Sequence, residues 1–190
     1  NSSDAVTAVS QSLRADTFKL FGIHREIDVI PNFYSTEHFE GDRNEEFRQS
    51  IAPNGEPILT HISNFRPVKR VEDVVRMFAR VRESMPAKLL MVGDGPDRSV
   101  AESICQERSL CGDIVFLGKV KNPVDALLVR DLFLLPSASA SFGLAALEAI
   151  AAVVPVLSSN SGGLPEVTLH GVRCLVSYVG FWASLSQPAF

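Results

Sequence analysis

The sequence has few cysteines, no excess of basic residues and no long apolar run. Its 190 residues hold three cysteines, and 18 Lys and Arg against 22 Asp and Glu give a net charge of −4. A nucleic-acid-binding module would carry a basic surface, so this charge argues against nucleic acid as a partner. No apolar run approaches the roughly 18 residues of a membrane span, and the first residues lack a signal-peptide pattern. We therefore expect a cytoplasmic protein without a transmembrane segment.

Several motifs of metal, phosphate and nucleophile sites are also missing. The odd number of cysteines shows no metal-ligand spacing, which indicates reduced packing residues. The chain contains no G-x-G-x-x-G, no Walker-type phosphate loop and no nucleophile elbow. Its 46% hydrophobic and 21% charged residues nevertheless predict a packed globular chain. The first residue is Asn, and we expect the chain to be a piece of a longer protein.

From residue 57 onward, apolar strand-like runs alternate with helical patterns. The clearest helix is residues 71–82, where Val71, Val74 and Phe78 recur at helical spacing with charges opposite. Strands that are apolar throughout are buried on both faces, and helical connections between them produce right-handed βαβ units. The predicted fold class is therefore α/β, a Rossmann-like doubly wound parallel sheet. The predicted strands are 57–62, 87–92, 113–117, 131–135, 155–158 and 173–176, and the helices are 71–82, 97–107, 124–129, 143–152 and 164–169.

The first 56 residues follow a different pattern. Residues 3–10 alternate like a strand, residues 11–21 are helical, and residues 27–30 resemble a second short strand. Residues 40–56 are polar and contain proline and glycine, which predicts a surface loop with at most a helical turn.

Ligands of open parallel sheets bind beyond the carboxyl ends of the strands, so the segments that follow the strands are the candidates. Segment 63–70 places Arg66, Lys69 and Arg70 at a strand-to-helix turn, where cations suit a diphosphate. A solvated loop that caps the next helix is the alternative. Segments 93–96 and 117–120 indicate by themselves only a glycine turn and a strand end.

Segment 136–149 carries the strongest signal. A loop of small residues leads into a helix near Gly143, so free N–H groups would face the strand ends as an anion site. Glu148 lies more than one turn further, on an otherwise apolar surface. A carboxylate there either pairs with another group or accepts hydrogen bonds from ligand hydroxyls. Glu166, after paired glycines, offers a weaker signal because a first-turn glutamate also favours the helix dipole.

Seven segments together carry a family resemblance over about residues 57–172. In chain order they read SNFRPVKRVEDVV, LLMVGDGPDR, VFLGKV, DLFLLPS, SFGLAALEA, VPV and GGLPEV. Their order and spacing resemble the retaining family 4 (group 1) glycosyltransferases of the GT-B fold. The resemblance implies that the chain is the C-terminal, nucleotide-sugar-binding half of a two-domain hexosyltransferase.

The resemblance also implies a domain division and partners. Residues 1–26 would be a remnant of the N-terminal acceptor domain and linker, residues 27–180 the donor domain, and residues 181–190 a tail of unknown role. The implied partners are a UDP-sugar donor, UDP-GlcNAc, and the missing acceptor domain, with no metal and no other cofactor. The branch that transfers the sugar to L-malate, in bacillithiol biosynthesis, is the most similar branch. The oligomeric state, including a homo-oligomer, stays open.

Individual residues match the motifs of the family. Lys69 and Asn64, with Arg66 as their neighbour, are implied to stabilise the leaving diphosphate, which makes them the expected catalytic residues. The implied donor-binding residues are Gly143, Leu144 and Phe142 near the phosphate, Glu148 at the ribose, Leu117, Gly118 and Lys119 at the uracil edge, and Gly93.

One departure from the family pattern bears directly on activity. The family has two glutamates seven residues apart, and the first, which touches the donor sugar, is Ala140 here. Alanine cannot accept a hydrogen bond from a sugar hydroxyl, so sugar positioning is at issue while uridine binding is not. Two alternatives stay open: a family member with another acceptor, such as a sugar or lipid-linked glycan, since the acceptor half is missing, and a catalytically silent nucleotide-binding domain, which Ala140 supports. In either case, we expect the chain alone to be inactive.

Overall fold

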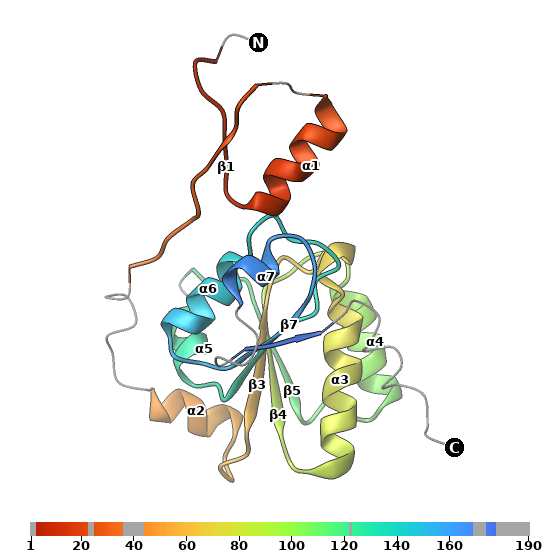
Figure 1. Cartoon of the computed structure of the whole chain (residues 1–190). Helices are drawn as coiled ribbons and strands as arrows, with labels where there is room; N and C mark the ends of the chain where they lie inside the picture. The colour runs from red at the N-terminus through yellow and green to blue at the C-terminus, as the bar shows by residue number, and fades with distance from the viewer. Residues whose placement is uncertain (1–2, 23–24, 36–43, 122, 169–173, 178–190) are drawn as a thin grey trace.

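The computed structural model describes residues 3–22, 25–35, 44–121, 123–168 and 174–177, and the predicted tail 181–190 lies outside this part. Its main body is a parallel sheet of six strands in the order β5-β4-β3-β6-β7-β8 (Figure 1). The order reverses between β3 and β6, as in doubly wound nucleotide-binding folds. The Rossmann-like α/β fold predicted from the sequence is confirmed. The strands are β3 (Ile58–Ile62), β4 (Lys88–Val92), β5 (Ile114–Gly118), β6 (Leu132–Leu135), β7 (Val156–Ser159) and β8 (Cys174–Ser177).

Helices cover both faces of this sheet (Figure 1). On one side lie α3 (Val71–Ser84) and α4 (Arg98–Glu107), and on the other α5 (Val124–Leu128), α6 (Leu144–Ala151) and α7 (Leu164–Val167). Alternate residues of one strand enter different cores: Leu59 packs with α3 and α4, whereas Ile58 packs with α5. The strands are therefore apolar throughout because both of their faces are buried.

The N-terminal residues form a separate unit. Here β1 (Thr7–Ala8) pairs in parallel with β2 (Asp28–Val29), and α1 (Gln11–Phe21) connects them. Both strands are shorter than the sequence predicts, while α1 has the predicted bounds. Figure 1 shows this unit above the end of the main body where α7 lies. Strand β2 lies within residues 27–180, the range predicted for the donor domain, and pairs with β1. The predicted domain division stays a prediction.

A second helix falls where the sequence predicts a surface loop. Residues 45–51 form α2 (Glu45–Ile51), which buries Ile51 against the main body. Its N-terminus is capped by Asn44, whose side-chain oxygen accepts a hydrogen bond from the Phe47 N–H at 3.0 Å. The polar composition hid this helix, because only one of its faces touches the core.

The sequence predicts reduced cysteines and no transmembrane segment, and the structure bears on both predictions. All three cysteines are free thiols. The sulfur of Cys105 lies 2.9 Å from the sulfur of Cys111, and burial raises the pKa of Cys105 to about 12. Within the described residues, no helix has the length and apolarity needed to cross a membrane.

Candidate functional site

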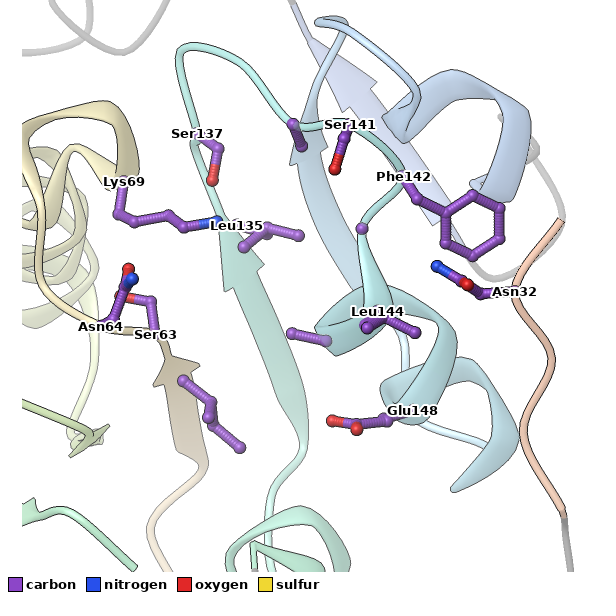
Figure 2. Close-up of a pocket in the computed structure, with 14 residues that line it drawn as sticks. Asn32, Ser63, Asn64, Lys69, Leu135, Ser137, Ser141, Phe142, Leu144 and Glu148 are labelled. Carbon is purple, nitrogen blue, oxygen red and sulfur yellow. The ribbon is translucent and has the colours of Figure 1, made fainter. Parts of the chain in front are cut away.

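A cavity of about 400 Å³ opens at the carboxyl ends of β3 and β6, where the strand order reverses (Figure 2). Crevices at such reversal points are the usual ligand sites of doubly wound sheets. The walls come from the end of β3, the loop after β6, the start of α6 and the segment after β2. The lining residues are Asn32, Ile62, Ser63, Asn64, Lys69, Leu135, Ser137, Ala140, Ser141, Phe142, Gly143, Leu144, Ala145 and Glu148.

The N-terminus of α6 forms one wall and supplies backbone donors. Gly143 precedes the helix with a φ of 108°, and a Cβ there would lie 2.5 Å from the side chain of Leu164. Glycine is therefore required where the loop turns into the helix. In the described part of the chain, the N–H groups of Leu144 and Ala145 have no hydrogen-bond partner. Free amides and the helix dipole make this wall attractive to an anion.

Glu148 faces the same cavity from the second turn of α6 (Figure 2). Its carboxylate has no hydrogen bond or ion pair with any described residue. Burial raises the pKa of Glu148, and the positive charge of Arg130 opposes this rise. The carboxylate is thus an unpartnered acceptor, which fits ligand hydroxyls.

Arg130 is the cation whose charge acts on the carboxylate of Glu148, and no pattern in the sequence singles it out. Only 1% of the residue is exposed, and its guanidinium carbon lies 5.0 Å from the centre of the Phe133 ring. Its Nη1 donates to the Ala126 carbonyl at 3.5 Å, whereas Nε and Nη2 have no partner among the described residues. Burial lowers the pKa of Arg130 to about 9, and Glu148 partly opposes this. The guanidinium therefore stays charged at neutral pH.

Lys69 provides a cation at the opposite wall. It ends the short 3-10 helix η2 (Pro67–Lys69), and partial burial lowers its pKa. No carboxylate of the described residues pairs with it. Figure 2 shows its side chain extending towards Leu135 and Ser137. Among the described residues, the fully buried Ser137 hydroxyl has no hydrogen-bond partner, so the lining holds a second unsatisfied donor.

The structure brings seven of the predicted site residues together at this cavity and leaves the others outside its lining. Arg66 is exposed and does not line it. Gly93 instead supports the cavity wall: a Cβ there would lie 1.7 Å from the Ser63 carbonyl oxygen, and its N–H donates to Gly118 at 2.8 Å. Of the predicted residues, those in the lining are Asn64, Lys69, Ala140, Phe142, Gly143, Leu144 and Glu148, and those outside are Arg66, Gly93, Leu117, Gly118 and Lys119.

Ala140 lines the cavity with a methyl group alone. Its carbonyl oxygen accepts a hydrogen bond from the Gly163 N–H at 2.7 Å, and a Cβ on Gly162 would lie 2.2 Å from the same oxygen. The backbone of the loop is therefore held closely by the paired glycines. The side chain at position 140 offers a ligand no hydrogen bond.

Sequence reasoning also missed other polar residues at or next to the cavity. Ser63 and Ser137 follow predicted strands and Ser141 precedes a predicted helix, positions that could have marked them. Asn32 enters from the segment after β2, and His61 lies within β3 behind Ser63. Pattern gave no signal for these two, because only the folded chain brings them to the cavity. Among the described residues, no three His, Cys, Asp or Glu side chains gather as metal ligands would.

Comparisons with known proteins give a consistent family. The sequence profile of the family described as Glycosyl transferases group 1 matches residues 42–187. The chain is 42% identical over 188 residues to N-acetyl-alpha-D-glucosaminyl L-malate synthase of Bacillus anthracis, covering 98% of this chain and 49% of that protein. It is 31% identical over 170 residues to D-inositol 3-phosphate glycosyltransferase of Nocardia farcinica, covering 83% and 38%.

A solved structure adds a likeness in fold. The Anabaena HepE protein in complex with UDP and glucose matches with a TM-score of 0.86 and 20% identity, over 97% of this chain and 53% of that one. The chain spans about half the length of the Bacillus relative and of this neighbour.

Proposed function

This chain belongs to the group 1 glycosyl transferases, and from that membership we propose that it is the donor-binding half of a retaining glycosyltransferase that takes its sugar from UDP-GlcNAc. One observation carries the proposal. Three unpartnered polar features of the right charge, Lys69, the N-terminus of α6 and the Glu148 carboxylate, face one cavity at the strand-order reversal.

The charges suggest how the donor lies. The diphosphate would lie between Lys69 and the free amides of Leu144 and Ala145, because both walls favour negative charge. The ribose would lie at Glu148, since a carboxylate without a partner accepts hydroxyl hydrogen bonds. Asn64 lies beside Lys69 in the lining and would add an amide donor to the phosphates.

In the proposed reaction, the bond between the sugar C1 and the phosphate oxygen breaks as the bond from C1 to the acceptor oxygen forms on the same face. The acceptor's proton passes to the departing phosphate. Negative charge grows on that phosphate as the bond breaks, so Lys69, Asn64 and the helix N-terminus stabilise the transition state more than the ground state. These groups would supply the electrostatic role without a metal ion.

The acceptor site is expected in the half of the longer relatives that this chain does not cover. We propose L-malate as the acceptor, supported by the 42% identity to the N-acetyl-alpha-D-glucosaminyl L-malate synthase of Bacillus anthracis. The 31% identity to an enzyme named for inositol phosphate supports another acceptor as the second candidate. Because the donor half does not contain the acceptor site, we expect this chain alone to transfer no sugar.

Ala140 supports a third candidate, a catalytically silent nucleotide-binding domain. A test is available in the longer protein: Ala140→Glu would restore a side chain able to accept from a sugar hydroxyl. A rise in turnover would identify position 140 as the defect. Unchanged turnover would count against that assignment.

Thermal unfolding with UDP and with UDP-GlcNAc tests the proposal directly. Ligand at about 100 times its Kd adds roughly 2.7 kcal/mol to the free energy of unfolding, which for a chain of this size raises Tm by very roughly 5–10 °C. We expect a shift with both ligands. Glu148→Ala should remove most of it, because the ribose loses its acceptor.

Glu83→Gln, on α3 away from the cavity, serves as the matched control, since exposed Glu83 pairs with Arg80 and does not line the cavity. It should shift with ligand as the unsubstituted chain does. If neither ligand moves Tm in the unsubstituted chain, the donor site is not on this half. A shift with UDP alone would mean that the sugar contact is lost.

A further inference from the structure

Behind the cavity, His61 and Ser63 form a hydrogen-bonded pair whose direction the structure defines. His61 is fully buried in β3, and its Nδ1 lies 2.9 Å from the carbonyl oxygen of Leu134 on β6. A carbonyl oxygen only accepts hydrogen bonds, so Nδ1 carries the proton. Burial lowers the pKa of His61 to about 4, so the ring is neutral near pH 7. The other nitrogen, Nε2, therefore has a lone pair and accepts.

The hydroxyl of Ser63 completes the pair. Its Oγ lies 2.8 Å from Nε2 of His61, and the Phe65 N–H points at the same Oγ from 3.3 Å. Since Nε2 accepts, Ser63 must donate its single proton inward to the histidine. Ser63 also lines the cavity, so only a lone pair of its oxygen is left for a ligand.

We propose that Ser63 is a hydrogen-bond acceptor for the donor sugar, and that His61 is a positioning residue that fixes this polarity. The inference rests on the proposed function. Phosphate oxygens are themselves acceptors near neutral pH, so this oxygen cannot bond to them. A sugar hydroxyl or an acetamido N–H is a donor and fits.

Two neighbours in the lining sharpen the assignment. The Ser137 hydroxyl has no partner among the described residues and stays free to donate to a phosphate, whereas the Ser63 oxygen can only accept. Ala140 offers the sugar no side-chain acceptor at all. Ser63 thus supplies an acceptor in a cavity where Glu148, the carboxylate among the described lining residues, is assigned to the ribose.

The alternative is that the pair only satisfies buried polar groups of β3. A purely structural pair would affect stability, and it would leave the ratio of the affinities for UDP-GlcNAc and UDP unchanged. The ratio therefore separates the two readings, because UDP lacks the sugar.

The experiment measures both ligands by calorimetry with the 190-residue chain and five variants, each checked for folding by thermal unfolding. Ser63→Ala should weaken UDP-GlcNAc by about 3- to 10-fold, the worth of one neutral hydrogen bond, and change UDP by less than about 2-fold. Ser63→Thr keeps the hydroxyl and should restore the ratio. Ser103→Ala, which removes an exposed hydroxyl on α4, is the matched control.

The role of His61 is tested with His61→Asn. The asparagine amide can still donate to the Leu134 carbonyl from near the position of Nδ1, but it does not reach Ser63. The freed hydroxyl can then rotate, so the preference for UDP-GlcNAc should fall. The same substitution in the Ser63→Ala background should leave the ratio as Ser63→Ala alone does.

Two results overturn the inference alone: equal losses for both ligands in Ser63→Ala, or a ratio that no variant changes. In both cases UDP still binds the unsubstituted chain and the proposed function stands. If UDP itself fails to bind the unsubstituted chain, the proposed function is wrong and the inference with it.

Discussion

At the scale of single residues, the site is marked by charged groups that the protein does not neutralise. Arg130 is buried with two unbonded nitrogens, and Glu148 is half-buried with no hydrogen bond from the described residues. Leaving such groups unpaired costs stability, so each is expected to have a role in binding. For Arg130, that role is to keep Glu148 ionised, because its charge opposes the rise that burial causes in the carboxyl pKa.

Arg130→Met tests this role through the pH dependence of uridine binding. Ionised Glu148 accepts from the ribose, so affinity is present above the folded-state pKa of Glu148 and is lost as pH falls through it. That pKa already lies above the ordinary 4.5, and loss of the guanidinium raises it further. The acid loss of uridine affinity should therefore move to higher pH in the variant.

Uridine is the ligand of choice here because it carries no phosphate whose titration would overlap. Calorimetry between pH 4.5 and neutrality supplies the profile. Thermal stability should change little, since the substitution also removes a buried charge with unbonded nitrogens. Superimposable profiles for the two proteins would contradict the role of Arg130.

Lys69→Ala tests where the phosphates lie. Lys69 is the cation in the lining, so its loss should weaken UDP by about 10-fold or more, the range of charge-assisted hydrogen bonds, and leave uridine nearly unchanged. Calorimetry with both ligands makes the comparison. Lys19→Ala, which removes an exposed cation from α1, controls for net charge. Equal losses of UDP and uridine in Lys69→Ala would mean that the lysine does not face the phosphates.

At the scale of elements, the sequence predicts the main body well because its signals are strong there. Apolar runs such as residues 89–92 are short and are followed by glycine, which favours a buried strand, and α3 has an unbroken helical pattern. The predicted ends differ from the observed ones by one or two residues. The site is predicted in part for the same reason, since Lys69 lies in the turn between β3 and α3, Gly143 directly precedes α6, and Glu148 lies in the second turn of that helix.

The remaining features depend on contacts between distant segments. Helix α2 is stabilised by burying Ile51, and the polarity of Ser63 depends on a carbonyl of β6, reached through His61. Arg66 looked equivalent to Lys69 in sequence, yet η2 exposes one and turns the other into the cavity. No local pattern carries this information.

Two helices, α1 and α7, connect the N-terminal unit with the main body. The N–H groups of Gln11 and Ser12, at the start of α1, have no partner within their own helix. Both donate to the carboxylate of Glu166 on α7, at 2.8 and 2.9 Å. Buried Ser10 accepts from the Leu13 N–H and donates to the Ser141 carbonyl, which belongs to the cavity wall. The start of α1 is thereby held against the loop before α6.

Glu166→Gln should loosen this join. We expect faster hydrogen exchange over residues 11–21 by a few-fold, consistent with the roughly 0.5–1 kcal/mol of an exposed charge at a helix N-terminus, and no change in β3 or β4. Ser10→Ala should have a larger effect, because it removes a buried cap. Asp16→Asn, on the exposed face of α1, is the matched control. Exchange that is unchanged in both variants would mean that these contacts do not hold α1 to the main body.

At the scale of the whole molecule, the pH dependence of stability depends on a histidine that the fold keeps neutral. His61 has a folded pKa of about 4 against an ordinary value of 6.5, because burial disfavours its charged form. The unfolded chain therefore binds more protons than the folded chain between these two pH values. The contribution of His61 to the free energy of unfolding is thus fully present above pH 6.5 and is lost as pH drops towards 4. The lowering of the His61 pKa from 6.5 to about 4 corresponds to about 3 kcal/mol of unfolding free energy.

His61→Asn should remove this contribution, because asparagine does not titrate. Urea unfolding of both proteins at pH 6.5 and at pH 4 gives the measurement. The carboxylates are common to the two proteins, and Glu148, whose pKa burial raises, acts in the opposite direction in both. The difference between the two pH dependences therefore isolates His61. The unsubstituted chain should lose about 3 kcal/mol more than the variant on acidification, and parallel losses would mean that the folded protein lets His61 take up a proton.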